Sequence, residues 1–251
     1  MSTVLVTGGT GTLGGHVVRE LLDAGHRVRV ASRRQAPDGS LPYTWATVDY
    51  REGTGLEAAL DGADAVVHCA TSFAGKETHV ASTVLDAARR IECPHLVYVS
   101  IVGVDRHPLG YYRAKHAAER LVTESGVPWT IQRATQFHDL VARLLGTLAR
   151  SPVLPVPAGV SVQPVHSGEV GARLAALAAG APAGRVPDLG GPEVRSLRDL
   201  AGSYLRATRR RRAVLPVRLA GAAYRGYRDG LHLAPAHRDG RLTFEQFLAQ
   251  R

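Results

Sequence analysis

Glycines at positions 8, 11 and 14 give the stretch TGGTGTLGG the pattern G-x-x-G-x-x-G, between a strand-like VLV and a helix-like HVVRELLDAG. In that context Gly8 permits a tight turn, Gly11 lets the backbone approach a pyrophosphate, and Gly14 lets the helix pack closely on the strand. The first turn of the helix offers phosphates its unpaired N–H groups and the positive end of its dipole. The stretch therefore predicts a nucleotide-binding turn rather than a purely structural one. The other residues expected to contact the nucleotide here are Thr10, Thr12 and Leu13.

A cationic segment follows the second predicted strand, in VRVASRR. NAD-preferring sites usually place an Asp or Glu at this point, about 20 residues after the glycines, to bind the ribose 2′-hydroxyl. Here Ser32, Arg33 and Arg34 stand in its place. A guanidinium binds a phosphate through two hydrogen bonds, whereas a carboxylate would repel it. The segment predicts NADP(H), whose 2′-phosphate needs a cation; the alternative is a solvated arginine pair.

Strands and helices alternate through the first half of the chain. Such alternation produces a parallel sheet with right-handed crossovers, so the predicted fold class is α/β, a doubly wound Rossmann-type sheet. The strands are expected at 4–7, 27–31, 43–49, 65–69, 96–100 and 129–133, and the helices at 14–24, 54–60, 76–90 and 111–125.

From about residue 136 the pattern loosens. The expected elements are helices at 138–149, 167–179 and 219–230, short strands in SVQPV and AVLPVRL, a strand-turn-helix at 189–208 and a proline-rich loop, SPVLPVPAG. We predict a dinucleotide-binding domain over 1–135 and a small C-terminal α/β substrate lobe over 136–251. The lobe is expected on the carboxyl edge of the sheet, where ligands bind in open α/β folds.

Five segments together resemble the short-chain dehydrogenase/reductase superfamily: TGGTGTLG, ASRR, VVHCAT, VYVSIVG and YYRAK. The chain is most similar to the atypical NmrA-like and isoflavone-reductase-like NAD(P)H-binding group, over roughly residues 1–200. The resemblance implies an NADPH-dependent oxidoreductase that reduces a carbonyl or activated double bond of a small, fairly apolar molecule. Two alternatives stay open: a non-catalytic NADP(H)-binding redox sensor that acts on a partner, and an epimerase or other lyase that uses the cofactor without net turnover.

The resemblance also implies three catalytic residues. Ser100 ends the fifth strand, where the superfamily places the serine that orients the carbonyl. Tyr111 and Lys115 have the Tyr-x-x-x-Lys spacing, which puts both on one face of a helix. A nearby ammonium lowers the tyrosine pKa from about 10, so Tyr111 is expected to act as the acid, and Lys115 also to bind the nicotinamide ribose. Tyr112 is adjacent, and the helix register decides which tyrosine faces the site.

Further cofactor contacts carry over at strand ends. Asp49 follows the third strand, where members often hold the adenine; a turn-capping aspartate is the alternative. The contacts expected after the fourth and sixth strands are Ala70, Thr71 and Ser72, and Ala134 with its neighbours Arg133 and Thr135.

The loop RATQFHD is also expected to begin the substrate pocket, with Gln136, Phe137 and His138 lining it. A lone histidine is more often structural than catalytic, which weakens the assignment of His138. His166 is better explained as part of a helix start capped by Ser167.

Composition sets the class of protein. The chain has 251 residues, 45% of them apolar and 21% charged, which suits one α/β domain with a small lobe. It shows neither a secretion signal nor an apolar run of the roughly 18–20 residues that span a bilayer. Cys69 and Cys93 lie in or beside apolar runs, so we expect both thiols to be buried and to form no metal site. The expected location of the protein is the reducing cytoplasm. The expected partner is a small-molecule substrate, without nucleic acid or a membrane span; the oligomeric state is open.

The net charge of +9 is concentrated at the C-terminal end. Residues 195–251 hold 13 arginines and four carboxylates, including RRRR at 209–212, whereas residues 1–194 are balanced. Such a surface suits nucleic acid, an acidic lipid headgroup or an acidic partner. No stacking aromatic residues interleave with the run, so the sequence favours a solvated arginine-rich face.

Overall fold

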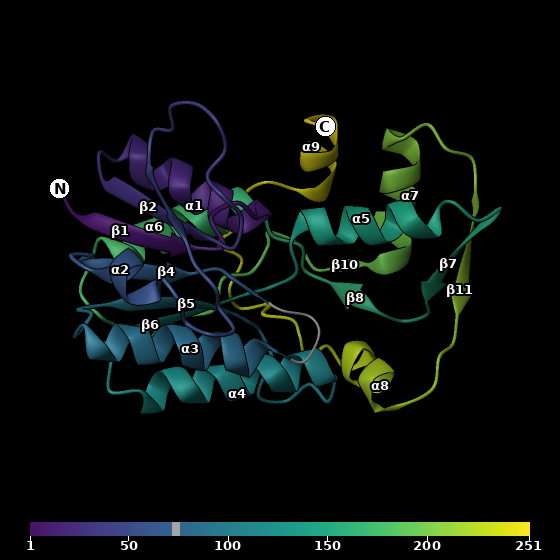
Figure 1. The fold of residues 1–251 in the computed structure, drawn as a ribbon. Coiled ribbons are helices and arrows are strands. Elements are labelled where there is room, and N and C mark those ends of the chain that lie inside the picture. The colour runs from purple at the N-terminus through teal and green to yellow at the C-terminus, as the bar shows by residue number, and fades with distance from the viewer. Residues whose placement is uncertain (72–75) are drawn as a thin grey trace. The chain divides into compact units, whose positions relative to one another are not determined.

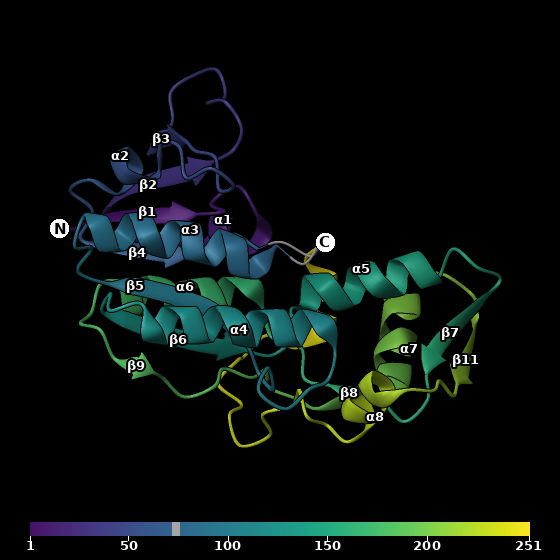
Figure 2. The ribbon, with the colours of Figure 1, turned by 60° about the horizontal axis from the view of Figure 1, so that its bottom comes forward.

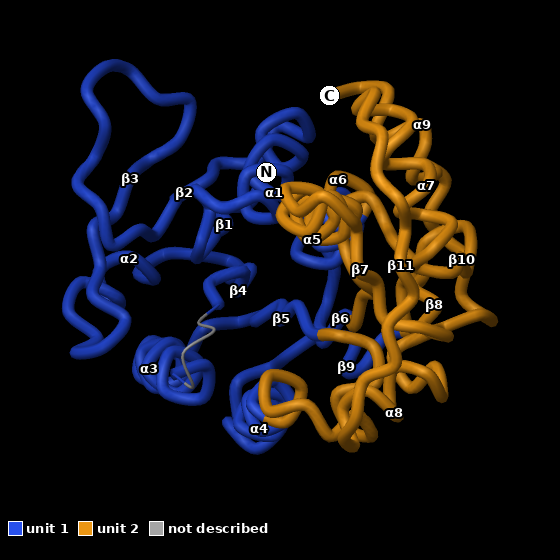
Figure 3. The backbone as a smooth tube through the Cα atoms, turned by 90° about the vertical axis from the view of Figure 1, so that its right-hand side faces the viewer, with its two compact units in different colours: residues 1–100, 114–132, 170–186 blue, residues 101–113, 133–169, 187–251 orange. Residues whose placement is uncertain are grey.

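The computed structural model describes residues 1–71 and 76–251, and its contacts divide the chain into two compact units (Figures 1 and 3). Unit 1 comprises 1–100, 114–132 and 170–186, and unit 2 comprises 101–113, 133–169 and 187–251. The segments of the two units interleave, whereas the sequence predicts a single boundary near residue 135. One reason is a close helix contact in unit 1: a Cβ added to Gly171 would lie 2.7 Å from the Cβ of His16.

A seven-stranded parallel sheet forms the centre of unit 1, in the order β3-β2-β1-β4-β5-β6-β9. The chain runs outward from β1 to β3 and then returns to place β4 on the other side of β1. Such a reversal is the switch point at which open α/β sheets bind ligands, so the predicted doubly wound fold is confirmed. The strands are β1 (Thr3–Thr7), β2 (Arg27–Ser32), β3 (Thr44–Thr47), β4 (Ala65–His68), β5 (Leu96–Ile101), β6 (Trp129–Ala134) and β9 (Gly184–Arg185).

Helices cover both faces of this sheet. Figures 2 and 3 show α1 and α6 on one face and α3 and α4 on the other. Strands β1 and β4 are buried along their whole length, as their continuous apolar sequences require when helices cover both sides. The helices are α1 (Thr12–Asp23), α2 (Leu56–Leu60), α3 (Glu77–Arg90), α4 (Gly110–Glu124) and α6 (Ser167–Ala178).

Unit 2 has its own core, which includes Leu145, Leu154 and Leu200. Around it lie a parallel pair of strands, β7 and β11, and an antiparallel pair, β8 and β10. The elements are α5 (His138–Leu148), β7 (Val153–Pro157), β8 (Ser161–Val162), β10 (Arg195–Ser196), α7 (Leu197–Ala207), β11 (Ala213–Val217), α8 (Ala222–Arg228) and α9 (Phe244–Ala249).

One predicted loop is a strand. The proline-rich segment 151–159 contains β7, which pairs with β11 in a two-stranded sheet. Proline has no N–H to donate, and an edge strand tolerates it because one side of the strand needs no donor. The two cysteines are free thiols: Cys93 is buried as expected, whereas Cys69 is only partly buried.

Acid should destabilise this fold because two histidines are buried in the neutral form. Burial lowers the pKa of His68 in unit 1 and of His232 in unit 2 from 6.5 to about 4. Between those values the unfolded chain binds more protons than the folded chain, so the free energy of unfolding falls as the pH drops from about 6.5 to 4. The expected loss is about 3 kcal/mol for each histidine. Urea unfolding across this range measures it, and a flat profile would contradict the assignment.

Candidate cofactor and active site

The glycine turn of unit 1 joins β1 to α1. Gly8 has φ +67°, and a Cβ there would lie 2.7 Å from the backbone nitrogen of Ala70. A Cβ on Gly14 would collide with the carbonyl oxygen of Gly8. The Gly11 N–H donates to that same oxygen at 2.9 Å. Gly8 and Gly14 are therefore required by the turn itself.

The outer side of the turn suits a phosphate. Thr10, Gly11 and Thr12 are exposed, while Leu13 is buried beneath them. Gly11 is the N-cap of α1, and no side chain among the described residues caps the helix. The first N–H groups of a helix have no partner within it, so an anion can accept from them. The turn thus fits the pyrophosphate of a dinucleotide.

The predicted cationic segment lies at the end of the neighbouring strand. In the register of β1 and β2, Thr7 pairs with Ala31, which brings Arg33 and Arg34 to the same sheet edge as the glycine turn. Both arginines are exposed. The Arg34 N–H donates to the Ser32 hydroxyl oxygen at 3.2 Å, which fixes the bend after β2.

Tyr50 gives a second indication that Arg33 lies near the turn. Burial raises the pKa of the Tyr50 hydroxyl to about 12, and the backbone of Gly8 and the charge of Arg33 both act in the opposite direction. The hydroxyl donates to the carbonyl oxygen of Ala31 at 3.0 Å. The buried Tyr50 hydroxyl therefore lies close enough to both the glycine turn and Arg33 to interact with them.

Asp49 is exposed and holds its own turn, because its carboxylate accepts from the Arg51 N–H at 2.7 Å. This is the turn-capping role that the sequence leaves open. The Ala70 N–H donates to the Thr7 hydroxyl at 3.2 Å, beside the glycine turn. Ser72 lies outside the described residues.

Lys115 is buried in unit 1 and bound on several sides. Its Nζ lies 2.7 Å from Oε1 of Glu77, 3.2 Å from the Tyr98 hydroxyl and 3.3 Å from the Val99 carbonyl oxygen. An ammonium has three N–H donors, and these three acceptors match them. A ribose hydroxyl would have to replace one of them to bind Lys115.

Glu77 completes this buried network. The Tyr98 hydroxyl donates to its Oε1 at 3.1 Å, and the Thr71 hydroxyl donates to its Oε2 at 2.8 Å. The side chains of Glu77 and Lys115 are 1% and 5% exposed, so the pair is almost wholly removed from water. Sequence reasoning missed Glu77 and Tyr98. The available signal was a tyrosine inside the buried strand LVYVS, near its carboxyl end.

Three polar atoms of unit 1 are buried without a hydrogen-bond partner among the described residues: Nδ1 of His95, Oγ of Ser100 and Nε2 of His68. The last two lie at the carboxyl ends of β5 and β4. The other ring nitrogen of His68 is 2.7 Å from the Thr7 hydroxyl, and its ring stacks on Tyr98 at 5.7 Å. An unpaired buried polar atom is costly, so a polar ligand atom would stabilise either group.

The register of α4 separates the two adjacent tyrosines. Tyr112 is buried in unit 2, with its ring 4.5 Å from that of His107 and 6.2 Å from that of Tyr227. Burial raises the pKa of Tyr112, which makes it a poor acid. Tyr111 is only partly buried. Of the two, Tyr111 is therefore the better candidate for proton transfer.

The last residues of β6 and Thr135, which follows them, form their contacts within unit 2. The guanidinium of Arg133 forms an ion pair with Asp105 at 3.2 Å. The carbonyl oxygen of Ala134 accepts from the Val102 N–H, and the Thr135 hydroxyl accepts from the Gly191 N–H. These bonds hold the backbone of Ala134 and the side chains of Arg133 and Thr135 in place.

The three predicted pocket residues differ in their surroundings. Gln136 and Phe137 are half-buried, and the Gln136 amide donates to the carbonyl oxygen of His232 at 3.3 Å. His138 is buried, donates from Nε2 to the Leu242 carbonyl oxygen at 2.9 Å, and stacks on Phe247 at 5.2 Å. These contacts give His138 a structural role in the core of unit 2.

Part of the chain is similar in sequence to known proteins. Over 172 residues, 65% of this chain, the chain is 32% identical to an uncharacterised protein of Mycobacterium tuberculosis. Over 141 residues, 54% of this chain, it is 25% identical to quinone oxidoreductase 2 of Escherichia coli. These matches cover 18% and 49% of the two relatives, so the chain spans less than half the length of the curated relatives that it matches.

Two solved structures share the fold over nearly the whole chain. The NADPH complex of the Escherichia coli NADPH-dependent quinone oxidoreductase aligns with a TM-score of 0.83 at 18% identity, covering 98% of this chain and 99% of that one. A Staphylococcus aureus protein described as a nucleoside-diphosphate-sugar epimerase aligns with a TM-score of 0.81 at 19% identity, with the same coverage.

Among the described residues, no helix is both long and apolar enough to cross a bilayer.

The match to a known family begins at the glycine turn. The model of the NAD(P)H-binding family matches residues 8–149, which is more than half of the chain. It starts at Gly8 and runs past both Arg33 and Lys115. The family match confirms the expectation of an NAD(P)H cofactor, and the two structural neighbours are a reductase and an epimerase of this fold. The chain belongs to the NAD(P)H-binding family.

Proposed function

We propose that the chain is an NADPH-dependent reductase of a carbonyl or activated double bond in a small, fairly apolar molecule. The observation that carries the proposal is the pair of exposed arginines, Arg33 and Arg34, after β2 at the edge that holds the glycine turn. Cations rather than a carboxylate stand there, which favours a 2′-phosphate. When bound, NADPH supplies the hydride.

The residues of the chain would bind the cofactor and donate the proton that the reduction requires. Gly8 and Gly11 hold the pyrophosphate, and Arg33 and Arg34 hold the 2′-phosphate. The Ser100 hydroxyl, buried without a partner among the described residues, donates a hydrogen bond to the substrate oxygen. Tyr111 is the proposed acid, and its phenol oxygen releases the proton that the reduction consumes. A quinone has both a carbonyl group and a conjugated double bond, and the Escherichia coli relative is named for that substrate class.

Tyr111→Phe tests the proton step, and Tyr112→Phe is its matched control on the same helix. Reduction of an aromatic aldehyde should lose about 100-fold in kcat/KM with Tyr111→Phe, because the alkoxide formed is strongly basic and needs an acid. Reduction of a p-benzoquinone should lose less, since its reduced form is a weaker base. Tyr112→Phe should keep kcat/KM within about threefold. Equal rates for the two variants would refute the role of Tyr111.

A non-catalytic redox sensor is the second candidate, and the neutralisation of Lys115 favours it. Glu77 offsets the ammonium charge at 2.7 Å, so the cation that would lower a tyrosine pKa is already paired. A sensor would distinguish NADPH from NADP+ in binding and turn over neither aldehyde nor quinone. Fluorescence titration of both cofactor forms, together with the substrate assays, separates the two functions.

A further inference from the structure

The paired strands β7 and β11 of unit 2 are apolar on both faces. Side chains alternate along a strand, and residues paired in a parallel register lie on the same face. Leu154 and Val156 of β7 point into the core, and Val214 of β11 packs against that core. These residues account for the inner face only.

The outer face is also apolar, although it is solvent-accessible. Val153 is 40% exposed and Leu215 is 51% exposed; the register sets Ala213 beside Val153 and Leu215 beside Pro155. Leu219, just after β11, is 51% exposed. Apart from Met1, the large apolar side chains found exposed among the described residues all belong to unit 2. The outer face is defined by Val153, Pro155, Pro157, Ala213, Leu215 and Val217.

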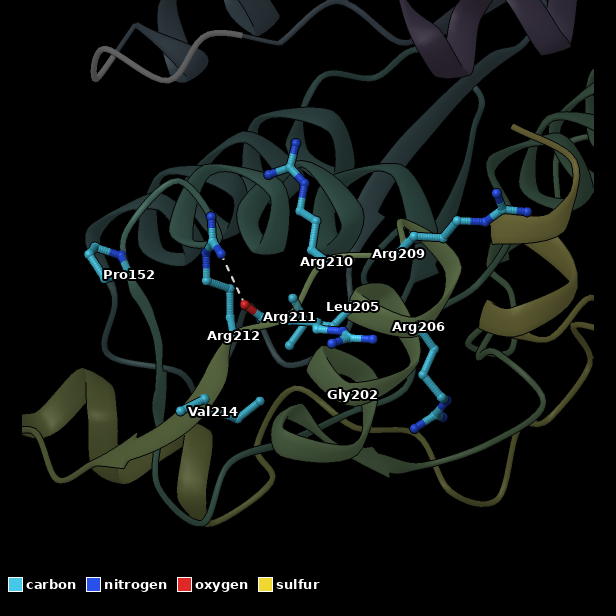
Figure 4. Close-up of a pocket in the computed structure, with 10 residues that line it drawn as sticks. Pro152, Gly202, Leu205, Arg206, Arg209, Arg210, Arg211, Arg212 and Val214 are labelled. Carbon is cyan, nitrogen blue, oxygen red and sulfur yellow. Dashed lines mark hydrogen bonds between the residues drawn. The ribbon is translucent and has the colours of Figure 1, made fainter.

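Arginines lie at both ends of β11. Arg206 and the run 209–212 line an open cavity of about 890 Å³ together with Pro152, Gly202, Leu205, Ala213 and Val214. Ala213 is the residue that this cavity shares with the outer face. Figure 4 shows the side chains of Arg209, Arg210 and Arg212 fanning outward from the turn between α7 and β11. No ion pair joins any arginine of the run to a carboxylate of the described part of the chain. Arg218 follows the other end of the strand and is exposed.

We propose that the outer face and the arginine run together bind the surface of an anionic lipid bilayer. Val153, Leu215 and Leu219 would enter the headgroup boundary, and the guanidinium groups would bind lipid phosphates in bidentate fashion. A cluster of four or more cations beside apolar side chains is the combination that anionic membranes attract. No further part of the chain needs to span the membrane.

The same observations argue against other occupants. Pairing this face with a second copy of the chain would bring two sets of unpaired arginines together, and like charges repel. Nucleic acid is bound through phosphates and stacked bases, but no aromatic side chain is among the residues that line the cavity. The apolar outer face would also gain nothing from contact with a polar phosphodiester backbone. An anionic lipid surface, by contrast, binds both the arginines and the apolar side chains.

Vesicle co-sedimentation tests the proposal with the full chain. Vesicles of phosphatidylglycerol and phosphatidylcholine in equal parts should bind the protein, and phosphatidylcholine alone should not. Replacing Arg209, Arg210, Arg211 and Arg212 by alanine should lower the partition coefficient at least about 100-fold. Leu215→Ser should lower it about fivefold, because it removes one inserted side chain.

A second quadruple variant provides the matched charge control. Arg19, Arg89, Arg90 and Arg120 are exposed arginines of unit 1, and their replacement by alanine changes the net charge equally. It should retain more than half of the vesicle binding. The proposal would be overturned if this control variant lost vesicle binding, or if Leu215→Ser bound vesicles as well as the unchanged protein. Binding of single-stranded DNA that Leu215→Ser does not weaken would identify a polyanion-binding surface instead. NADPH titration of each variant checks its fold.

Discussion

Replacing Glu77 with alanine should lower the free energy of unfolding by about 3–5 kcal/mol, although the position lies at the first turn of a helix and resembles an ordinary surface residue in the sequence. The substitution would leave the ammonium of Lys115 buried with its nearest anion removed. It would also strip the hydroxyls of Tyr98 and Thr71 of their acceptor. Urea unfolding of the variant measures the loss.

The chain offers a matched control for this prediction. Glu57 and Arg90 form an ion pair of the same 2.7 Å length, but their side chains are 54% and 66% exposed. Glu57→Ala should change the free energy of unfolding by less than about 1 kcal/mol, because water replaces an exposed partner at little cost. Equal effects of Glu57→Ala and Glu77→Ala would mean that burial does not govern the Glu77–Lys115 pair.

A double-mutant cycle separates the pair from its surroundings. Lys115→Met alone should also be strongly destabilising, since it leaves the Glu77 carboxylate buried without its cation. Glu77→Gln alone should be destabilising as well, since it leaves the Lys115 ammonium buried without its anion. Glu77→Gln with Lys115→Met should recover a large part of the loss, because no uncompensated charge remains. Strict additivity of the two single effects would contradict a direct interaction.

Replacing Arg33 and Arg34 together with alanine should weaken NADPH binding about 100-fold and leave NADH binding within about threefold. Charge-assisted bidentate hydrogen bonds to the 2′-phosphate account for an effect of this size, and NADH has no such phosphate. Fluorescence titration of both nucleotides into the protein and the variant measures the ratio.

Arg27 supplies the control for this cofactor prediction. It is an exposed arginine at the opposite end of the same strand, so Arg27→Ala changes the charge without touching the predicted phosphate site. Arg27→Ala should leave the NADPH-to-NADH ratio unchanged. A parallel fall for both nucleotides in the double variant would mean that the arginines contribute only general attraction to anions.

Local features of the sequence determined the fold class and the cofactor. The turn at Gly8, Gly11 and Gly14 depends on the conformational freedom of glycine and on close contacts between backbone atoms a few residues apart. The sequence of this short stretch is therefore enough to predict a phosphate-binding turn. The alternation of strands and helices is likewise a short-range pattern, and it predicted the seven-stranded sheet except for its short last strand. Arg33 follows β2 directly, which made its position at the sheet edge readable.

Only the tertiary structure decided the partners of Lys115 and the faces of the adjacent tyrosines. Glu77 and Lys115 come from different helices and meet because α3 and α4 cover the same face of the sheet, a contact with no local signature. Tyr112 is buried and Tyr111 is not because the packing of α4 sets its register, which spacing alone leaves undefined. Strand β7, within the proline-rich segment, depends on its pairing with β11, which is distant in the sequence. Its prolines are compatible with a strand only at the edge of a sheet, so the local sequence alone predicted a loop.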